Sequence, residues 1–403
     1  MGALDDLLVG AVEAFPHGRL EALLATGKPL RVKLGFDPTR PDLHLGHAVV
    51  LEGLRRFQEA GHQVVLIIGD FTARIGDPTG KEAARPPLTA GEVAGNARTY
   101  LEQLGLMIDL DKAEIHHNAS WLEKMDLAAV LRLLGQATVA QMLARDNFAR
   151  RHARGDAIGL HELLYPLLQG QDSVEIRADV ELGGDDQRFN LLVGRDLQAA
   201  AGQQQQACVT YGLLVGTDGH EKMSKSLGND IPLTCPAEDM YGRVMSVPDT
   251  ALPDWWRLAS ARTATEVREV CAALEVGSLH PRDAKMRLGR AVVARFHGAE
   301  AAEAAEAAFV RRFQERALPV DIPVANGWSA GAQLAPLLVR LGLATTTSDA
   351  RRLVTQGGVR RHRDEGSAEV LSDPLQIVGP EFTGMVLQAG KRRFVRLGTP
   401  GTA

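Results

Sequence analysis

The sequence predicts an α/β fold built on a Rossmann-like, doubly wound parallel sheet. Residues 30–36 and 64–68 are short apolar runs with the length of buried strands, and residues 45–60 between them carry apolar side chains at helical spacing. A strand–helix–strand unit of this kind is parallel and right-handed. Further strand-like runs then alternate with helical stretches, which is typical of a doubly wound sheet.

The strands and helices of this sheet follow one another along the first half of the chain. The helix at 45–60 stops at Gly61, and its apolar stripe consists of Val49, Val50, Leu54 and Phe57. Later strands are expected at 114–117, 177–181 and 207–211, and helices at 91–104 and 186–200. From Trp121 to Leu168 the pattern is helical throughout, which predicts an insertion at about 121–168 beside the sheet.

The second half of the chain changes character after Pro236, where the pattern becomes almost wholly helical. A linker is marked by Pro319, Pro323, Asn326 and Gly327. Beyond it, two short helices at 332–341 and 348–356 and hairpin-like strands up to 397 predict a small α+β module. The expected parts are a Rossmann-like domain at 1–231, a helical domain at 232–318, a linker at 319–331 and a small α+β module at 332–403.

Composition narrows the class of protein. The 403 residues are 45% hydrophobic and can bury at least two cores. Only three cysteines occur, without a CxxC pair, which argues against a disulfide framework and a structural zinc site. The first ten residues lack a signal-peptide pattern, and no uncharged run approaches the length of a membrane span. We therefore expect a cytoplasmic protein with no membrane partner and no protein-bound metal.

Charge is unevenly distributed along the chain. The net charge is −5, yet residues 332–403 contain ten Lys and Arg against six Asp and Glu, so this segment is +4 and the remainder −9. A basic module on an acidic body is typical of a protein that binds nucleic acid. A solvated surface face explains the charge alone equally well.

His44 and His47 form the string HLGH at the predicted start of the helix at 45–60. Imidazoles three residues apart project from the first turn, where free N–H groups attract anions. Gly46 leaves room for an adenine or a phosphate to approach the backbone, and Asp42 is expected to cap the helix. Alone, such a motif is more typical of surface histidines. Here it follows a strand end at 35–39, where α/β sheets bind ligands.

A second string, KMSKS at 222–226, lies in a polar loop between Gly219 and Gly228. The flanking glycines predict a mobile loop that brings the ammonium groups of Lys222 and Lys225 to a pyrophosphate. Two lysines in a loop are usually only solvated charge. The five-residue string is specific, however, and its combination with HLGH indicates a chain that activates a substrate with ATP.

Polar residues also interrupt an apolar helical face. Tyr165, Gln169 and Asp172 lie at i, i+4 and i+7, on a face that Leu164 and Leu168 otherwise line. Unpartnered polar groups do not belong on such a stripe, although a helix edge facing water would also explain them. Glycine-rich turns at 183–187 and 76–80 carry acids and an amide, so three polar turns at strand ends define one cleft.

With these motifs the sequence resembles class I aminoacyl-tRNA synthetases of the tyrosine/tryptophan subgroup, and most closely bacterial tyrosyl-tRNA synthetases. HLGH and KMSKS match the class signatures, and residues 340–344, 348–353 and 357–359 resemble an S4-type RNA-binding domain. The resemblance covers the whole chain. It implies activation of L-tyrosine with ATP and Mg²⁺, transfer to tRNA(Tyr), and a homodimer that meets through residues 131–153.

The resemblance also implies roles for individual residues. Thr39 and His44 contact the ATP phosphates, His47 supports the adenylate, and Lys222 and Lys225 close over the triphosphate. The nucleotide site further includes Gly46, Gly184, Asp186 (at the ribose) and Ser226. The tyrosine site comprises Asp77, Tyr165 and Gln169 at the α-amino group, Asp172 at the phenol hydroxyl, Gln187 near the carboxylate, Asp37 and Lys33. The tRNA contacts include Arg351, Arg352 and Arg360, and the basic stretch 145–154 helps to place the acceptor end.

The sequence departs from this family at the phenol contact. Many bacterial members carry a tyrosine at the position of Lys33, and often a ribose-contacting cysteine at Leu34. The second phenol contact is therefore expected from the Lys33 side chain or from water. Two other readings are a tryptophan-specific synthetase with the same core, and a non-enzymatic RNA-binding protein with a disabled core. The intact signatures argue against the latter.

Overall fold

A computed structural model describes residues 2–78, 88–313, 318, 322–363, 368–390 and 393–401. The chain divides into two compact units, Met1–Glu303 and Ala304–Ala403, here called the N-terminal and C-terminal units. Pro319 and residues 79–80 of the predicted glycine-rich turn lie outside the described residues.

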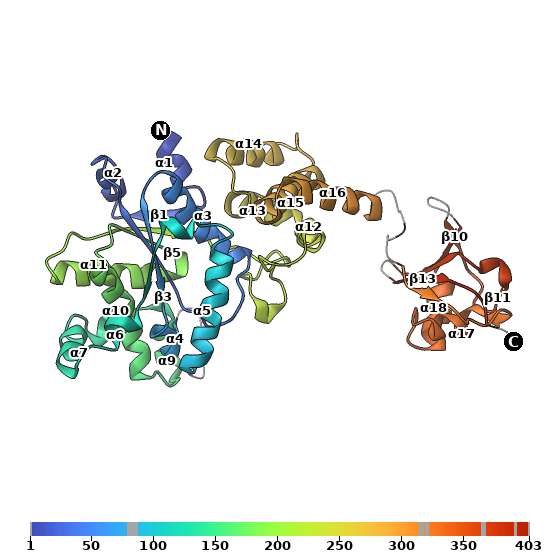
Figure 1. Ribbon diagram of the computed structural model, residues 1–403, viewed down its shortest axis with the longest axis horizontal. Coiled ribbons are helices and arrows are strands. Elements are labelled where there is room, and N and C mark those ends of the chain that lie inside the picture. The colour runs from blue at the N-terminus through green and yellow to red at the C-terminus, as the bar shows by residue number, and fades with distance from the viewer. Residues whose placement is uncertain are drawn as a thin grey trace. The chain divides into compact units, whose positions relative to one another are not determined.

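The N-terminal unit is built on a six-stranded sheet with the order β1-β6-β5-β2-β3-β4 (Figure 1). Its strands are β1 (Ala11–Phe15), β2 (Arg31–Phe36), β3 (Gln63–Ile68), β4 (Glu114–His117), β5 (Val180–Gly184) and β6 (Ala207–Tyr211). All neighbours pair in parallel except β1 and β6. The predicted α/β class is confirmed, and the antiparallel edge strand β1 was not predicted.

The central strands form because their residues are apolar on both faces. In β3, every residue from Val64 to Ile68 is buried, as a parallel strand covered by helices requires. Helix α3 (Leu45–Glu59) packs against β2, β3 and β5, whereas α11 (Arg188–Ala200) packs against β5 and β6. Since the two right-handed crossovers run in opposite directions from the β2/β5 pair, their helices cover opposite faces. The strand order therefore reverses between β2 and β5.

Helices before and between the strands complete the sheet layer. They are α1 (Gly2–Leu7), α2 (Arg19–Leu24), α4 (Thr72–Ile75), α5 (Ala90–Leu104), α6 (Ala119–Leu122), α7 (Leu127–Leu134), α8 (Val139–Leu143), α9 (Asp146–Arg154) and α10 (Leu160–Glu175). The predicted insertion corresponds to α6–α10 and has no strand among its described residues. Helix α10 packs along α11, which brings the predicted polar face of α10 beside the sheet.

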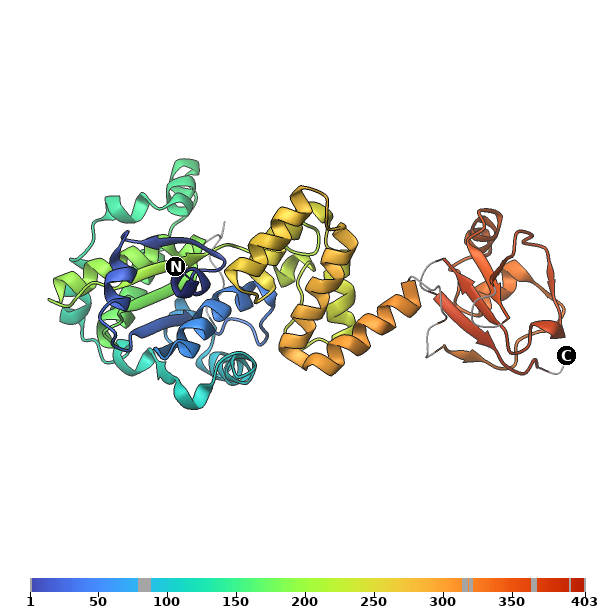
Figure 2. The same cartoon turned by 90° about the horizontal axis from the view of Figure 1, so that it is seen from above.

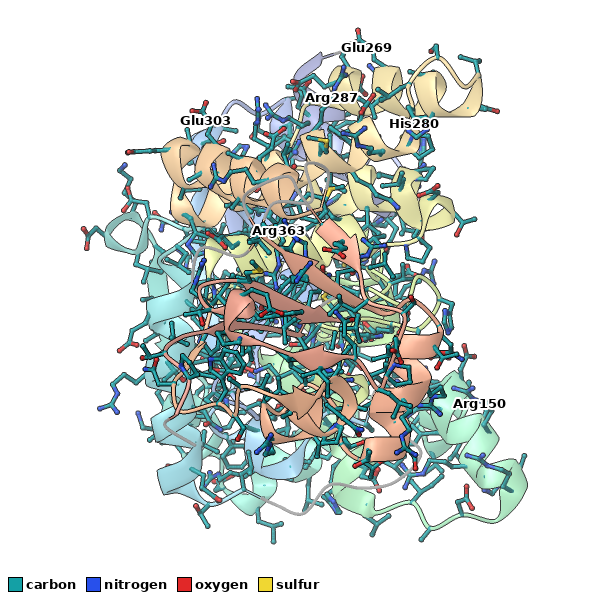
Figure 3. The ribbon with its side chains drawn as sticks, turned by 90° about the vertical axis from the view of Figure 1, so that its right-hand side faces the viewer. Arg150, Glu269, His280, Arg287, Glu303 and Arg363 are labelled. Atoms are coloured by element: carbon teal, nitrogen blue, oxygen red, sulfur yellow. The ribbon has the colours of Figure 1, made fainter. Side chains whose placement is uncertain are left out.

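A helical group follows the sheet (yellow and orange in Figure 2). It consists of α12 (Ala237–Ser246), α13 (Leu252–Ala259), α14 (Ala264–Glu275) and α15 (Pro281–His297), and α16 (Ala299–Phe313) follows. Figure 3 labels Glu269 on α14 and Arg287 on α15. This group agrees with the helical segment expected after Pro236. In the described part of the chain, no helix is both long and apolar enough to cross a membrane.

The C-terminal unit is a small α+β module. A five-stranded sheet has the order β10-β9-β12-β13-β7, and β11 pairs with β8. The strands are β7 (Val324–Ala325), β8 (Ala332–Gln333), β9 (Val359–His362), β10 (Ala368–Val370), β11 (Ile377–Val378), β12 (Val386–Ala389) and β13 (Arg393–Leu397). Helices α17 (Leu334–Arg340) and α18 (Thr347–Thr355) match the two predicted helices.

Part of the segment expected as a linker belongs to this module. β7 pairs in parallel with β13, and Trp328 is buried in the same core as Leu338 and Leu387. The Trp328 indole donates a hydrogen bond to the Gly398 carbonyl at 2.8 Å. Residues 324–328 of the expected linker are therefore part of the fold of the module.

Candidate active site

A cavity of about 720 Å³ opens at the carboxyl ends of β2 and β5, where the strand order reverses. This position is the ligand crevice of doubly wound sheets. Its lining includes most of the residues expected at the site: Asp37, His44, Gly46, His47, Asp77, Tyr165, Gln169, Asp172, Gly184, Asp186, Gln187, Lys222 and Ser226. Lys33, Thr39 and Lys225 do not line it.

His44 and His47 cap the helix α3 that carries them. The His44 Nδ1 atom accepts a hydrogen bond from the Gly46 N–H at 3.1 Å, and His47 Nδ1 accepts one from the His44 N–H at 3.2 Å. His44 is thus the N-cap, and the expectation that Asp42 fills this role is wrong. A Cβ on Gly46 would lie 2.9 Å from His44 Cε1, so the glycine makes room for the capping ring.

Both histidines are neutral at physiological pH. Burial, together with the charges of Lys225 and Lys222, lowers the pKa of His44 to about 4. Burial, followed by the neighbouring His44 and the two lysines, lowers the pKa of His47 to about 3. Because Nδ1 of each ring accepts a backbone hydrogen bond, each proton resides on Nε2. The start of α3 thus supplies two uncharged N–H donors to the cavity wall.

Each of the two loop lysines is paired with an acid from another segment of the chain. Lys222 Nζ bonds Asp186 Oδ2 at 2.8 Å, and Lys225 Nζ bonds Asp42 Oδ2 at 2.5 Å. Within the loop, Met223 is buried and Ser224 N–H donates to Asn229 Oδ1 at 2.7 Å. A buried anchor therefore fixes the loop, and of its two lysines Lys222 lines the cavity while Lys225 does not.

A short turn after β5 presents Asp186. Gly184 ends the strand, and a Cβ there would lie 2.7 Å from Asp186 Oδ1. The absence of a side chain at Gly184 thus gives the carboxylate its place on the cavity wall. Because Asp186 already holds Lys222, it links the β5 turn to the KMSKS loop.

Asp37 is fixed from two sides at the end of β2. The Tyr165 hydroxyl donates to Asp37 Oδ2 at 2.9 Å, and Thr72 Oγ1 donates to Asp37 Oδ1 at 2.7 Å. Burial and the charge of Asp37 raise the pKa of Tyr165 well above its usual range, so the phenol stays protonated. Half-buried Thr39 follows two residues later, and its N–H donates to the Asp37 carbonyl at 2.7 Å.

A chain of amides joins the remaining polar residues. Gln187 Nε2 donates to Asp77 Oδ2 at 2.7 Å, and Asn190 Nδ2 donates to both Gln187 Oε1 (2.8 Å) and Gln169 Oε1 (2.9 Å). Arg145 Nη2 from the insertion lies 3.7 Å from Asp77 Oδ1. Sequence reasoning missed Asn190, whose position one helical turn after Gln187 was the available signal.

Asp172 is a buried carboxylate on the cavity wall. The Trp121 indole N–H donates to Oδ1 at 2.9 Å, and Asn118 Nδ2 donates to Oδ2 at 3.3 Å. Burial raises the pKa of Asp172 to about 7, although the charge of Lys33 and these two hydrogen bonds act in the opposite direction. Sequence reasoning also missed Trp121 and Asn118, because nothing in their local pattern connects them to α10.

The structure gives Lys33 other partners than a phenol. Its side chain is fully buried, and Nζ bonds the Gln169 carbonyl (3.0 Å), Ser173 Oγ (2.8 Å) and Glu181 Oε1 (2.9 Å). An ammonium group has three donors. Since all three are in use and Lys33 does not line the cavity, it has no donor left for a bound ligand.

The three predicted tRNA contacts lie in the C-terminal unit. Arg351 and Arg352 are exposed on α18, and half-buried Arg360 lies on β9. Arg352 bonds Asp349 at 2.8 Å. Among the described residues, no group of three or more His, Cys, Asp or Glu side chains is placed to hold a metal ion.

Known proteins resemble this chain over nearly its whole length. Residues 25–314 match the family described as tRNA synthetases class I (W and Y). The tyrosine–tRNA ligase of Moorella thermoacetica is 49% identical over 394 residues, which are 97% of this chain and 94% of the relative. The tyrosine–tRNA ligase of Idiomarina loihiensis is 47% identical over 397 residues, covering 98% of this chain and 97% of the relative.

Solved structures share the fold. A C-terminally truncated mitochondrial tyrosyl-tRNA synthetase from Aspergillus nidulans superposes with a TM-score of 0.64 at 23% identity, covering 77% of this chain and 94% of that structure. The tyrosyl-tRNA synthetase of Archaeoglobus fulgidus, solved with L-tyrosine, gives a TM-score of 0.61 at 22% identity over 75% of this chain and 98% of that structure.

Proposed function

The chain belongs to the class I tRNA synthetases of the tryptophan and tyrosine type, and we propose that its cavity is the site where L-tyrosine reacts with ATP. Its activity is tyrosine–tRNA ligation. Tyrosine first becomes tyrosyl-adenylate with release of pyrophosphate, and the tyrosyl group then passes to the terminal adenosine of tRNA(Tyr). Mg²⁺ enters with the nucleotide.

The observation that carries the proposal is the buried carboxylate of Asp172 on the cavity wall. Trp121 and Asn118 orient its two oxygens, so it accepts the hydrogen bond of a phenol hydroxyl at a fixed place. Asp77, Gln169 and Tyr165 lie along the same cavity for the α-amino group, and Gln187 lies near the carboxylate. A ligand with a cation at one end and a hydroxyl at the other satisfies both groups.

The chemistry then depends on position and electrostatics. The carboxylate of tyrosine attacks the α-phosphorus of ATP in line, and negative charge develops on the phosphate oxygens as pyrophosphate departs. Neutral Nε2–H donors at His44 and His47 meet these oxygens at the start of α3, where backbone N–H groups also attract anions. We propose that Lys222 and Lys225 supply positive charge from the loop, that Asp186 holds the ribose and that Thr39 contacts the phosphates.

Amino-acid-dependent exchange of pyrophosphate into ATP, measured with each of the twenty amino acids, tests the function directly. Tyrosine should support exchange, and tryptophan should not. Exchange with tryptophan alone would assign the same core to the other branch of the family, and no exchange at all would favour the non-enzymatic reading.

We also propose a homodimer that meets through the insertion. Helix α7 exposes Leu127, Leu131 and Leu134, at 73%, 59% and 42% of their surface, and Val139 at the start of α8 is 65% exposed. A contiguous apolar helix face of this kind is an interaction surface. The family implies a second copy as its occupant. Exposed Arg150, labelled on α9 in Figure 3, belongs to the basic stretch proposed to place the tRNA acceptor end.

The double variant Leu127→Asp/Leu131→Asp should shift the protein from dimer to monomer, because two carboxylates would have to be buried without partners. Light scattering coupled to size exclusion measures this. Val276→Asp is the matched control, since Val276 is 76% exposed outside the insertion and its replacement should leave the mass unchanged. A dimeric double variant would contradict the proposed interface.

The C-terminal unit is proposed to bind tRNA through phosphates. Replacing Arg351, Arg352 and Arg360 by glutamine should weaken tRNA binding, and it should reduce the slope of log affinity against log salt by about one per lost phosphate contact. Filter binding at several salt concentrations measures both. Tyrosine-dependent pyrophosphate exchange is the internal control and should not change. An unaltered salt slope would show that these arginines do not contact phosphate.

A further inference from the structure

The proposed tyrosine site rests on a buried ion pair that no part of the reaction uses. Lys33 on β2 and Glu181 on β5 are register partners in the parallel pairing at the switch point. Their Nζ–Oε1 distance is 2.9 Å, and both side chains are essentially excluded from solvent. Burying two charges is costly, so such a pair calls for an explanation beyond stability.

Every polar atom of this pair has a partner. Glu181 Oε1 accepts from Lys33 and, at 3.3 Å, from Gln169, while Oε2 accepts from Ser173 (3.0 Å) and Gln206. The Lys33 ammonium in turn bonds the Gln169 carbonyl and Ser173 on α10. The charge is therefore fixed in place by two strands and one helix.

The fixed ammonium lies at the turn of α10 that carries Asp172. Ser173 follows Asp172 in sequence, and Gln169 precedes it by three residues, so two of the three Lys33 hydrogen bonds are made to this turn. Within the described part of the chain, the side-chain donors to the Asp172 carboxylate are the neutral groups of Trp121 and Asn118. The positive charge of buried Lys33 thus favours the charged form of Asp172.

We propose that Lys33 is a positioning residue that keeps Asp172 in the carboxylate form that accepts the phenol hydrogen bond. A protonated Asp172 would turn one of its two oxygens from acceptor into donor, in competition with Trp121 or Asn118. The inference rests on the proposed tyrosine site and adds the group that sets the pH range of tyrosine recognition. It replaces the direct Lys33–phenol contact.

Groups from several elements act on Asp172 or lie near it. Lys33 from β2 favours the carboxylate, and Glu181 from β5 opposes it. The Tyr165 phenol is on the same helix and interacts with Asp172, and it stays protonated beside Asp37. Trp121 and Asn118 contribute neutral donors from the segment after β4, and Thr72 on α4 accepts from Asn118 at 3.1 Å. His44 and His47 titrate near pH 4 and 3, well below Asp172.

The test is the pH dependence of tyrosine binding, measured by equilibrium dialysis without ATP. A range from about pH 5.5 to 8.5 is suitable, because a carboxyl group with a pKa of about 7 changes its protonation state within it. In the wild-type chain, affinity should fall as Asp172 becomes protonated. Glu181→Gln removes the opposing charge and should move this fall to lower pH. The double variant Lys33→Met/Glu181→Gln removes the favourable charge as well and should move it upward by about one pH unit relative to Glu181→Gln.

If the pH midpoint of tyrosine binding lies lower in Glu181→Gln than in the double variant, Lys33 acts through its charge and not only through packing. A uniform loss of affinity at all pH values, with the midpoint unchanged in both variants, would overturn the proposal. If Glu181→Gln does not fold, because the Lys33 ammonium loses its buried partner, the double variant still decides: its fall in affinity should lie at higher pH than that of the wild type. Asp172→Asn is the reference: it should bind tyrosine weakly and without this pH dependence. If Asp172→Asn binds as the wild type does, the proposed tyrosine site itself is wrong.

Discussion

Replacing Asp172 by alanine should remove most of the preference for tyrosine over phenylalanine. A site that hydrogen-bonds a substrate hydroxyl discriminates against the analogue without it by a factor of roughly 10⁴ to 10⁵ in kcat/KM. This factor is the one known for tyrosyl-tRNA synthetases. Phenylalanine would leave the buried Asp172 carboxylate without its ligand partner, whereas the alanine variant has no such group to leave unpaired. The ratio of kcat/KM values in pyrophosphate exchange measures the effect.

Glu175→Ala is the matched control for this experiment. Glu175 is an exposed carboxylate on the same helix α10, so its removal should leave the tyrosine-to-phenylalanine ratio unchanged. If Asp172→Ala keeps the wild-type ratio of kcat/KM for tyrosine over phenylalanine, another group hydrogen-bonds the phenol hydroxyl. Lys33 could take over only by giving up one of its three buried partners.

Replacing Lys225 by alanine should slow adenylate formation by about 10² to 10³, because a positioned donor to transition-state charge typically contributes about 3 to 4 kcal/mol. Tyrosine binding should change little, since Lys225 does not line the cavity. Single-turnover measurement of tyrosyl-adenylate formation separates the two effects.

Two controls isolate the chemical role of Lys225. Its ammonium is paired with Asp42 at 2.5 Å, so Asp42→Ala tests whether the loss comes only from this resting ion pair. Lys28→Ala removes an exposed lysine outside the cavity. Both should retain near wild-type rates. If Asp42→Ala is as slow as Lys225→Ala, the lysine acts by holding the loop and not by meeting the phosphates.

The sheet was predictable because its signals are local. The apolar runs of β2 and β3 and the stripe of α3 each lie within one window of sequence, and the structure has all three at the expected places. β1 was missed since it is short and largely exposed, with only Phe15 fully buried. The strand expected at 177–181 begins at Val180, because Arg177 has a left-handed backbone (φ 50°) that ends the preceding helix.

Site residues could be predicted where several of them lie together in one short sequence motif. HLGH and KMSKS are such strings, and the structure brings His44, His47 and Lys222 to one cavity. Trp121, Asn118 and Asn190 were not found, since their contacts to Asp172 and Gln169 form only when distant segments pack. For Lys33, the sequence indicated the correct strand, and its partner Glu181, 148 residues away, is a property of the tertiary fold.

The pairing of Lys33 with Glu181 also constrains how relatives of this chain can diverge. A neutral residue at position 33 would leave the Glu181 carboxylate buried in the sheet without its charged partner. A neutral residue at position 181 would leave the Lys33 ammonium buried in the same way. A chain with only one of the two substitutions would contain an unpaired buried charge and would be less stable. The residues at positions 33 and 181 are therefore expected to change together. Relatives with tyrosine in place of Lys33 are therefore expected to carry an uncharged residue in place of Glu181, and an alignment across the family would reveal the two positions as a covarying pair.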